Sequence, residues 1–308
     1  MNELRRGSRL QLPIFFIFAF AITWAVQIPA YMTAHDQGLS LTNEANVFHF
    51  TDLFAGQLPP AFRPVFLLYT FAFGPTVAGI VVTAIFKGRE GLRDLWGRVS
   101  KIRIPPRWIA IILAIPFVLS LGALGLGFLM GGLQPIEFDF LVPVSMAVAL
   151  LAYMIVFTGL AEEVGWRGYA LPELQRHYTA EKASWILGIL WGLWHLPANL
   201  MTPFLRGELT IPLTVMYIAG LTFGIVGWTI VLTWVFNNTG SVFWIIILHG
   251  LSNTLQSYLI LSSSNVQPAS LAFIALPWGF AIFLLKRYGS ETLTGKRTDT
   301  MASQPQPA

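Results

Sequence analysis

Eight long apolar runs constrain the fold of this chain more than any other feature of its sequence. A helix needs roughly 20 residues to cross the hydrocarbon core of a bilayer, and each run approaches or exceeds that length. Backbone polar groups in a bilayer have no water to pair with, and a helix pairs them within its own segment. The sequence therefore predicts an all-α fold, a polytopic membrane helix bundle with about eight transmembrane helices. The runs are approximately 11–33, 62–86, 108–131, 140–161, 183–202, 211–236, 242–262 and 269–285.

The composition excludes an ordinary soluble domain. Of the 308 residues, 55% are hydrophobic and 11% are charged, whereas soluble domains are about 25% charged. The chain has no cysteine, which excludes disulfides, thiolate metal ligands and a cysteine nucleophile. The net charge is +4, but the basic residues are confined to particular loops. This pattern indicates orientation in a membrane and no nucleic-acid partner.

The basic residues alternate from one side of the predicted bundle to the other. Seventeen of the nineteen lysines and arginines lie in the segments 1–10, 87–107, 162–182 and 286–297, and only Arg63 and Arg206 lie in the others. Cytoplasmic loops carry an excess of basic residues, so we expect both termini to be cytoplasmic. The first run has no clear cleavage site after it and is predicted to be a retained anchor.

One domain accounts for most of the chain. No polar linker divides residues 1–288, so we expect a single transmembrane helical domain there. Residues 289–308 are mostly polar and end in QPQPA, which predicts a disordered C-terminal tail. We therefore expect an integral, multi-pass membrane protein, and the compact loops and lack of cysteine favour a prokaryotic cell membrane.

Two adjacent carboxylates, Glu162 and Glu163, follow twenty-one residues, 140–160, that carry no charge. Arg167 lies four residues after Glu163, which is the favourable order for an ion pair on one helix face. Glu162 projects about 100° away from Glu163 around a helix, and without an arginine it is the better general base of the two. The alternative is a pair of acids solvated at the membrane edge.

Three further polar side chains lie within predicted spans, where ionisable and polar residues are costly. His195 lies about twelve residues into its run, and Pro197 predicts a local kink just after it. His249 and Asn253 are four residues apart and share a helix face. Each has a structural alternative, namely a neutral histidine bonded to a helix carbonyl or a polar seam between helices.

Taken together, Glu162, His195, His249 and Asn253 offer a base, two imidazoles and an amide, which is the inventory of a hydrolytic site. Amide hydrolysis needs an activated water and donors for the oxyanion, and these residue types supply both. A zinc site with Glu162, His195 and His249 as ligands would use the same residue types, and residue type alone does not decide between the two. No serine lies in a GxSxG-like turn, which disfavours a serine mechanism.

Three motifs occur in order along the chain: EExxxR at 162–167, an aromatic residue four positions before a histidine at 191–195, and HxxxN at 249–253. This set, the motif core at 161–254, resembles the CPBP family of intramembrane proteases. That family includes CAAX prenyl endopeptidases of the Ras-converting type and bacteriocin-processing or self-immunity proteins. One position departs from the family pattern, because the second motif usually begins with Phe and here begins with Trp191. The change keeps an aromatic residue, so we expect it to matter little.

The resemblance implies an intramembrane endopeptidase. Because Glu162 lies at the predicted inner end of the run 140–161, we expect its site to open toward the cytoplasm. Glu162 resembles the family's water-activating glutamate, and His195 resembles its partner. His249 and Asn253 resemble the pair on the oxyanion side.

Glu163 and Arg167 resemble the supporting pair of the family, whose dependence on a metal such as zinc the sequence does not settle. The implied partner is a peptide or protein substrate within membrane lipid, and some family members cleave after a prenylated C-terminal cysteine. Two other functions remain open: a non-catalytic immunity or scaffold protein, and a proton-coupled transporter. A transporter would be expected to have paired broken helices in two related halves.

Overall fold

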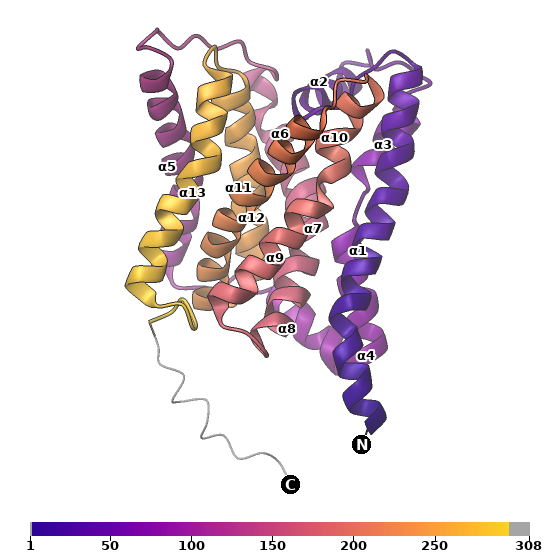
Figure 1. Ribbon diagram of the computed structural model, residues 1–308, viewed down its shortest axis with the longest axis vertical. Helices are drawn as coiled ribbons and strands as arrows, with labels where there is room; N and C mark the ends of the chain where they lie inside the picture. Colours follow the sequence, from indigo (N-terminus) through magenta and orange to yellow (C-terminus); the bar gives the residue numbers. More distant parts are fainter. Residues whose placement is uncertain (1, 296–308) are drawn as a thin grey trace.

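A computed structural model describes residues 2–295, and it describes side chains from residue 10 onward except at 43–45. Within these residues the chain is a helical bundle without a β-sheet, as predicted, and one isolated bridge joins Phe138 to Ser263 (Figure 1). The helices are α1 (Asn2–Asp36), α2 (Asn43–Phe54), α3 (Arg63–Thr70), α4 (Gly74–Val99), α5 (Pro106–Met130), η1 (Val144–Met146), α6 (Ala147–Met154), η2 (Ile155–Leu160), α7 (Ala161–Gly165), η3 (Trp166–Ala170), α8 (Leu171–Gln175), α9 (Ala180–Trp194), α10 (Leu196–Leu205), α11 (Ile211–Thr239), α12 (Val242–Leu255), η4 (Gln256–Leu261) and α13 (Val266–Tyr288).

Six segments in the described part of the chain are long and apolar enough to cross a membrane, and α3 with α4 makes a seventh if this pair, bent by 49°, is one span. The remaining predicted run, 183–202, consists of α9 and α10, which have 15 and 10 residues. The prediction of about eight helices is therefore close, and the difference lies in one broken helix. The six segments are Leu10–Asp36, Pro106–Met130, Val144–Gln175, Ile211–Thr239, Val242–Leu261 and Val266–Tyr288.

The fourth predicted run is longer than its sequence suggested. We expected it to end near residue 161, with Glu162 at its inner end, but the helical segment runs from Val144 to Gln175. Two charged residues in this extension, Glu163 and Arg167, are fully buried and pair with each other, so their charges do not end the helix. Glu162 consequently lies near the middle of the span.

The two ends of the bundle differ in charge. In Figure 1, α1 begins and α13 ends at the same end of the bundle, which also holds the C-terminal part of α4 and the segment between α8 and α9. These elements carry most of the basic residues counted above, whereas α2 lies at the opposite end. The arrangement agrees with an even number of crossings, and the assignment of the basic end to the cytoplasm stays a prediction.

The largest buried apolar cluster fills the half of the bundle near the basic end. It includes Val82 of α4, Ile112 of α5, Trp166 of η3, Leu187 of α9 and Leu232 of α11, all of them buried.

The start of the predicted tail is part of the folded bundle. The carbonyls of residues 290 and 291 accept hydrogen bonds from the first residues of α9, and Leu293 is 0% exposed. Asn238 of α11 donates to the Leu293 carbonyl at 3.0 Å. The packed chain therefore extends to at least residue 295, and the rest of the predicted tail, 296–308, lies outside the described residues.

Candidate active site

The two adjacent acids lie on α7, where the helix geometry is irregular. η2 before it and η3 after it have the wide hydrogen bonding of a π-helix, which is rare and occurs frequently at functional sites. Glu162 lines a cavity, whereas Glu163 contacts His249 of α12. The two carboxylates therefore face different surroundings, as their adjacent positions on a helix predicted.

His195 lies at the break between α9 and α10. Pro197 is the second residue of α10 and has no N–H to continue the hydrogen-bond ladder of α9, so the kink predicted there is present. The His195 N–H donates to the Gly192 carbonyl at 3.2 Å, and the Trp191 carbonyl is bonded to His195 Nδ1 at 2.8 Å. Because a carbonyl only accepts, Nδ1 carries the hydrogen and Nε2 keeps a lone pair.

Two glycines allow α12 to approach η2 closely. A Cβ atom on Gly250 would lie 2.7 Å from Cα of Ile155, and one on Gly159 would lie 2.5 Å from the carbonyl oxygen of Ile246. Both distances are shorter than a Cβ atom can adopt without a shift of the backbone. The glycines therefore permit the approach that places His249 beside Glu163.

A buried ion pair supports His249 from behind the cavity. Arg167 Nη1 donates to Glu163 Oε1 at 3.0 Å, and His249 Nδ1 donates to the same oxygen at 2.8 Å. Glu163 and Arg167 are each 0% exposed, and neither lines the cavity. The predicted i,i+4 contact is present, and it provides each buried charge with the partner that a low-dielectric setting requires.

Trp191 connects all these groups, and the sequence did not reveal its importance. Its indole N–H donates to Glu162 Oε2 at 2.6 Å, and its carbonyl accepts from His195. Its ring lies 4.3 Å from the Arg167 guanidinium and makes an edge contact with His249 at 5.6 Å. We expected the change from Phe to Trp to matter little, but only Trp has an N–H that reaches Glu162. The available signal was a large buried side chain with a polar tip, which usually needs a partner.

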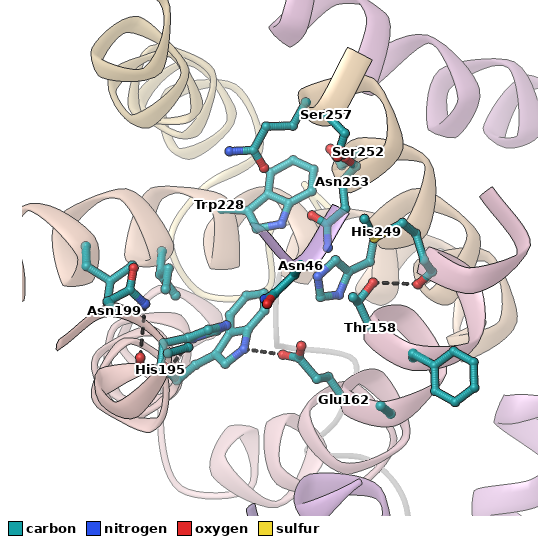
Figure 2. A pocket seen from close by; sticks show the side chains of 18 of the residues that line it. Asn46, Thr158, Glu162, His195, Asn199, Trp228, His249, Ser252, Asn253 and Ser257 are labelled. Carbon is teal, nitrogen blue, oxygen red and sulfur yellow. Dashed lines mark hydrogen bonds between the residues drawn. The ribbon is translucent and has the colours of Figure 1, made fainter. Parts of the chain in front are cut away.

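The structure brings Glu162, His195, His249 and Asn253 together around one cavity of about 370 Å³ (Figure 2). They come from α7, from the break between α9 and α10, and from α12, so side chains from three separate parts of the chain converge on this cavity. The cavity extends from these residues into the half of the bundle that holds α2, because Asn46 of α2 also lines it. The catalytic roles of the four side chains stay predictions.

A zinc site does not fit these residues as they are arranged. Among the side chains that the structure describes, no group of three or more His, Asp or Glu residues could hold a metal ion. Glu162, His195 and His249 line the same cavity, but as they are placed they do not form such a group. The zinc ligand set considered from the sequence is therefore absent from this arrangement.

These features define a class: a multi-pass helical membrane protein with a buried carboxylate, two imidazoles and an amide at one cavity. Residues 144–255 match the family model described as Type II CAAX prenyl endopeptidase Rce1-like. The chain is also 28% identical over 195 residues to a protein named CAAX prenyl protease 2 from Methanococcus maripaludis, a similarity that covers 62% of this chain and 71% of that relative. The resemblance to the CPBP family is therefore confirmed, and residues 144–255 are the segment that matches the family model.

Proposed function

We propose that this protein hydrolyses a peptide bond within the membrane and that Glu162 is the base that activates the water. The position of Glu162 carries the proposal. It is 6% exposed, it lines the cavity, and its Oε2 is held by Trp191. Oε1 is then free to take a proton from a water molecule in the cavity.

The neighbouring groups divide into acceptors and donors. A water between Glu162 and Nε2 of His195 transfers a proton to Glu162 as its oxygen attacks the substrate carbonyl carbon. Nε2–H of His249 and the amide of Asn253 donate to the oxyanion that forms. Glu162 then gives the proton to the leaving amine as the C–N bond breaks, so one water is consumed for each bond cleaved.

Charge balance supports this division of roles. For His249 to donate from Nε2 while Nδ1 donates to Glu163, its ring must be an imidazolium. The buried cluster then contains two carboxylates, Glu162 and Glu163, and two cations, Arg167 and His249. A cluster without net charge is the least costly one to bury, and Glu163 serves as the counterion that the imidazolium needs.

The apolar side of the cavity suggests the kind of substrate. Leu221, Ile225 and Trp228 of α11 and Phe273 and Ile274 of α13 line it. The relative from M. maripaludis is named a CAAX prenyl protease. We propose a peptide or protein substrate that carries a long apolar group, such as a prenylated C-terminal cysteine, and that reaches the site from membrane lipid in a prokaryotic cell membrane.

The depth of Glu162 in the bundle bears on the side of the membrane from which the site opens. A cytoplasmic opening was predicted because Glu162 was expected at the inner end of its helix, and in the structure it lies near the middle. If the basic end is cytoplasmic, the cavity extends from the middle of the bundle toward the opposite end. We therefore propose hydrolysis at mid-depth, and cysteine labelling, described in the Discussion, tests the orientation.

The decisive experiment compares the purified protein with Glu162→Gln, which keeps the shape of the side chain and removes the base. Quenched fluorescent peptides with and without a prenylated C-terminal cysteine serve as substrates. We expect Glu162→Gln to lose about 10²–10⁴-fold in rate, the usual contribution of a general base, and the prenylated peptides to be preferred. Equal cleavage by the two proteins would remove Glu162 as the base and favour a non-catalytic role.

A further inference from the structure

The cavity has a second polar wall that belongs to the N-terminal helices. Gln27 of α1, Asn46 of α2 and Tyr69 of α3 line the same cavity as Glu162. None of the three lies within residues 144–255, the segment that matches the protease family. In Figure 2 the Asn46 side chain projects over the space that Glu162, His195 and His249 surround.

A chain of hydrogen bonds fixes the orientation of Asn46. Tyr31 OH donates to the Ala198 carbonyl at 3.2 Å, so Tyr69 OH, 3.4 Å away, donates to Tyr31. The lone pairs of Tyr69 OH then accept from Asn46 Nδ2 at 2.9 Å. With its nitrogen so used, the amide has Oδ1 as its remaining acceptor, and this atom is buried without a hydrogen-bond partner among the described residues.

Gln27 presents a second acceptor of the same kind. It is 7% exposed, and its Oε1 is also buried without a hydrogen-bond partner in the described part of the chain. One turn before it, Trp24 Nε1 donates to the Trp194 carbonyl at 3.0 Å, and one turn after it Tyr31 is bonded to Ala198. These two contacts fasten α1 on either side of the α9–α10 break, so Gln27 is held rigidly beside the site.

Two unpaired amide oxygens in an apolar bundle are costly unless a ligand completes them. Both oxygens belong to neutral amides, and Glu162 is the one acidic side chain among the described residues that line the cavity. With so little negative charge, the cavity suits N–H donors more than a cation. An extended peptide has such donors at regular intervals along its backbone.

We propose that Gln27 Oε1 and Asn46 Oδ1 accept hydrogen bonds from two backbone N–H groups of the substrate peptide. These bonds orient the chain across Glu162 and His249 and select against proline or N-methyl residues at the two bound positions. Gln27 and Asn46 are positioning residues in this account, and the inference rests on the proposed endopeptidase function.

The test removes the donor and the acceptor separately. In each peptide of a set, one backbone amide is replaced by an ester, so that each peptide lacks one N–H at a different position. The protein variants are Gln27→Met and Asn46→Leu, with Gln37→Met, at an exposed position just after α1, as a matched control. We expect one ester position to lower kcat/KM about five- to tenfold in the unmodified protein, mostly through KM, and to have no further effect in Gln27→Met. An ester at a different position should lower kcat/KM in the unmodified protein and have no further effect in Asn46→Leu.

The same comparison can be made without turnover. The affinity for each peptide is measured in the Glu162→Gln protein, alone and combined with Gln27→Met or Asn46→Leu. Ester and residue effects that add independently in both formats would overturn the positioning role. If the effects on binding are coupled but the unmodified protein cleaves none of the peptides, the result supports the peptide-binding site and refutes the proposed protease function. Thermal unfolding of each variant separates loss of fold from loss of a contact.

Discussion

The indole N–H of Trp191 donates a hydrogen bond of 2.6 Å to Oε2 of Glu162. This bond joins α9 to α7 across the cavity and leaves the other carboxylate oxygen of Glu162 for water. Because a hydrogen bond to a carboxylate is stronger than one between neutral groups, it fixes the direction of the Glu162 side chain.

Replacement of Trp191 by Phe removes this bond and keeps an aromatic ring over Arg167. We expect kcat to fall about 10- to 100-fold, the usual value of a hydrogen bond to a charged group, with a smaller change in KM. Steady-state kinetics on the quenched peptides measures both. Trp185→Phe, at a partly exposed position on the same helix, should have little effect, and an equal loss in both variants would argue against a specific role for Trp191.

The Glu163–Arg167 pair should show strong coupling in stability. Glu163→Gln leaves the Arg167 guanidinium fully buried without its counterion, which costs about 3–5 kcal/mol. Arg167→Met alone should cost a similar amount. Chemical unfolding in detergent micelles measures both. The double variant should recover much of the loss, because the two charges left in the cluster, the Glu162 carboxylate and the His249 imidazolium, balance each other. Costs that simply add in the double variant would contradict the pairing.

Gly250→Ala should destabilise the bundle and reduce activity together. The added Cβ would lie 2.7 Å from the Ile155 backbone, and overpacking of this kind costs about 1–3 kcal/mol. The shift of α12 would also move His249 from Glu163. Gly125→Ala on α5 is the control, since its Cβ would meet nothing within 4 Å, and there the loss of backbone freedom in the unfolded state should stabilise the helix by about 0.5–1 kcal/mol. Thermal unfolding should therefore show opposite signs for the two.

The absence of cysteine makes orientation directly measurable. Ala55→Cys lies just after α2, and Ser100→Cys lies just after α4, at opposite ends of the bundle, and both positions are exposed. If the basic end is cytoplasmic, a membrane-impermeant maleimide added to intact cells should label Ala55→Cys and leave Ser100→Cys unlabelled until the cells are opened. The reverse pattern would place the α2 end of the cavity in the cytoplasm.

Cleavage should persist when divalent metals are chelated. Glu162, His195 and His249 do not form a ligand set in the described residues, and the proposed chemistry uses the carboxylate and a water. We expect 1,10-phenanthroline and EDTA to change the rate less than about twofold, against the much larger loss caused by Glu162→Gln. Inhibition that added zinc reverses would show that the helices rearrange to bind a metal.

The sequence by itself determined the fold class, the approximate number of spans and the four polar side chains that meet at the cavity. Uncharged runs of membrane length leave the backbone no alternative to helices, and polar side chains within such runs are few enough to be identified individually. The i,i+4 contact of Glu163 with Arg167 and the kink at Pro197 were also predictable, because both depend on local helix geometry alone.

Only the tertiary structure decided which groups meet across helices. Glu163 bonds to His249 because two glycines let α12 and η2 approach, and Trp191 reaches Glu162 because α9 and α7 face each other across the cavity. Asn46 lies in a short helix whose sequence carries no sign of a site, and it lines the cavity because α2 covers that end of the bundle. The extension of the fourth span to Gln175 is likewise non-local, since the charges of Glu163 and Arg167 are tolerated only where the folded bundle pairs them.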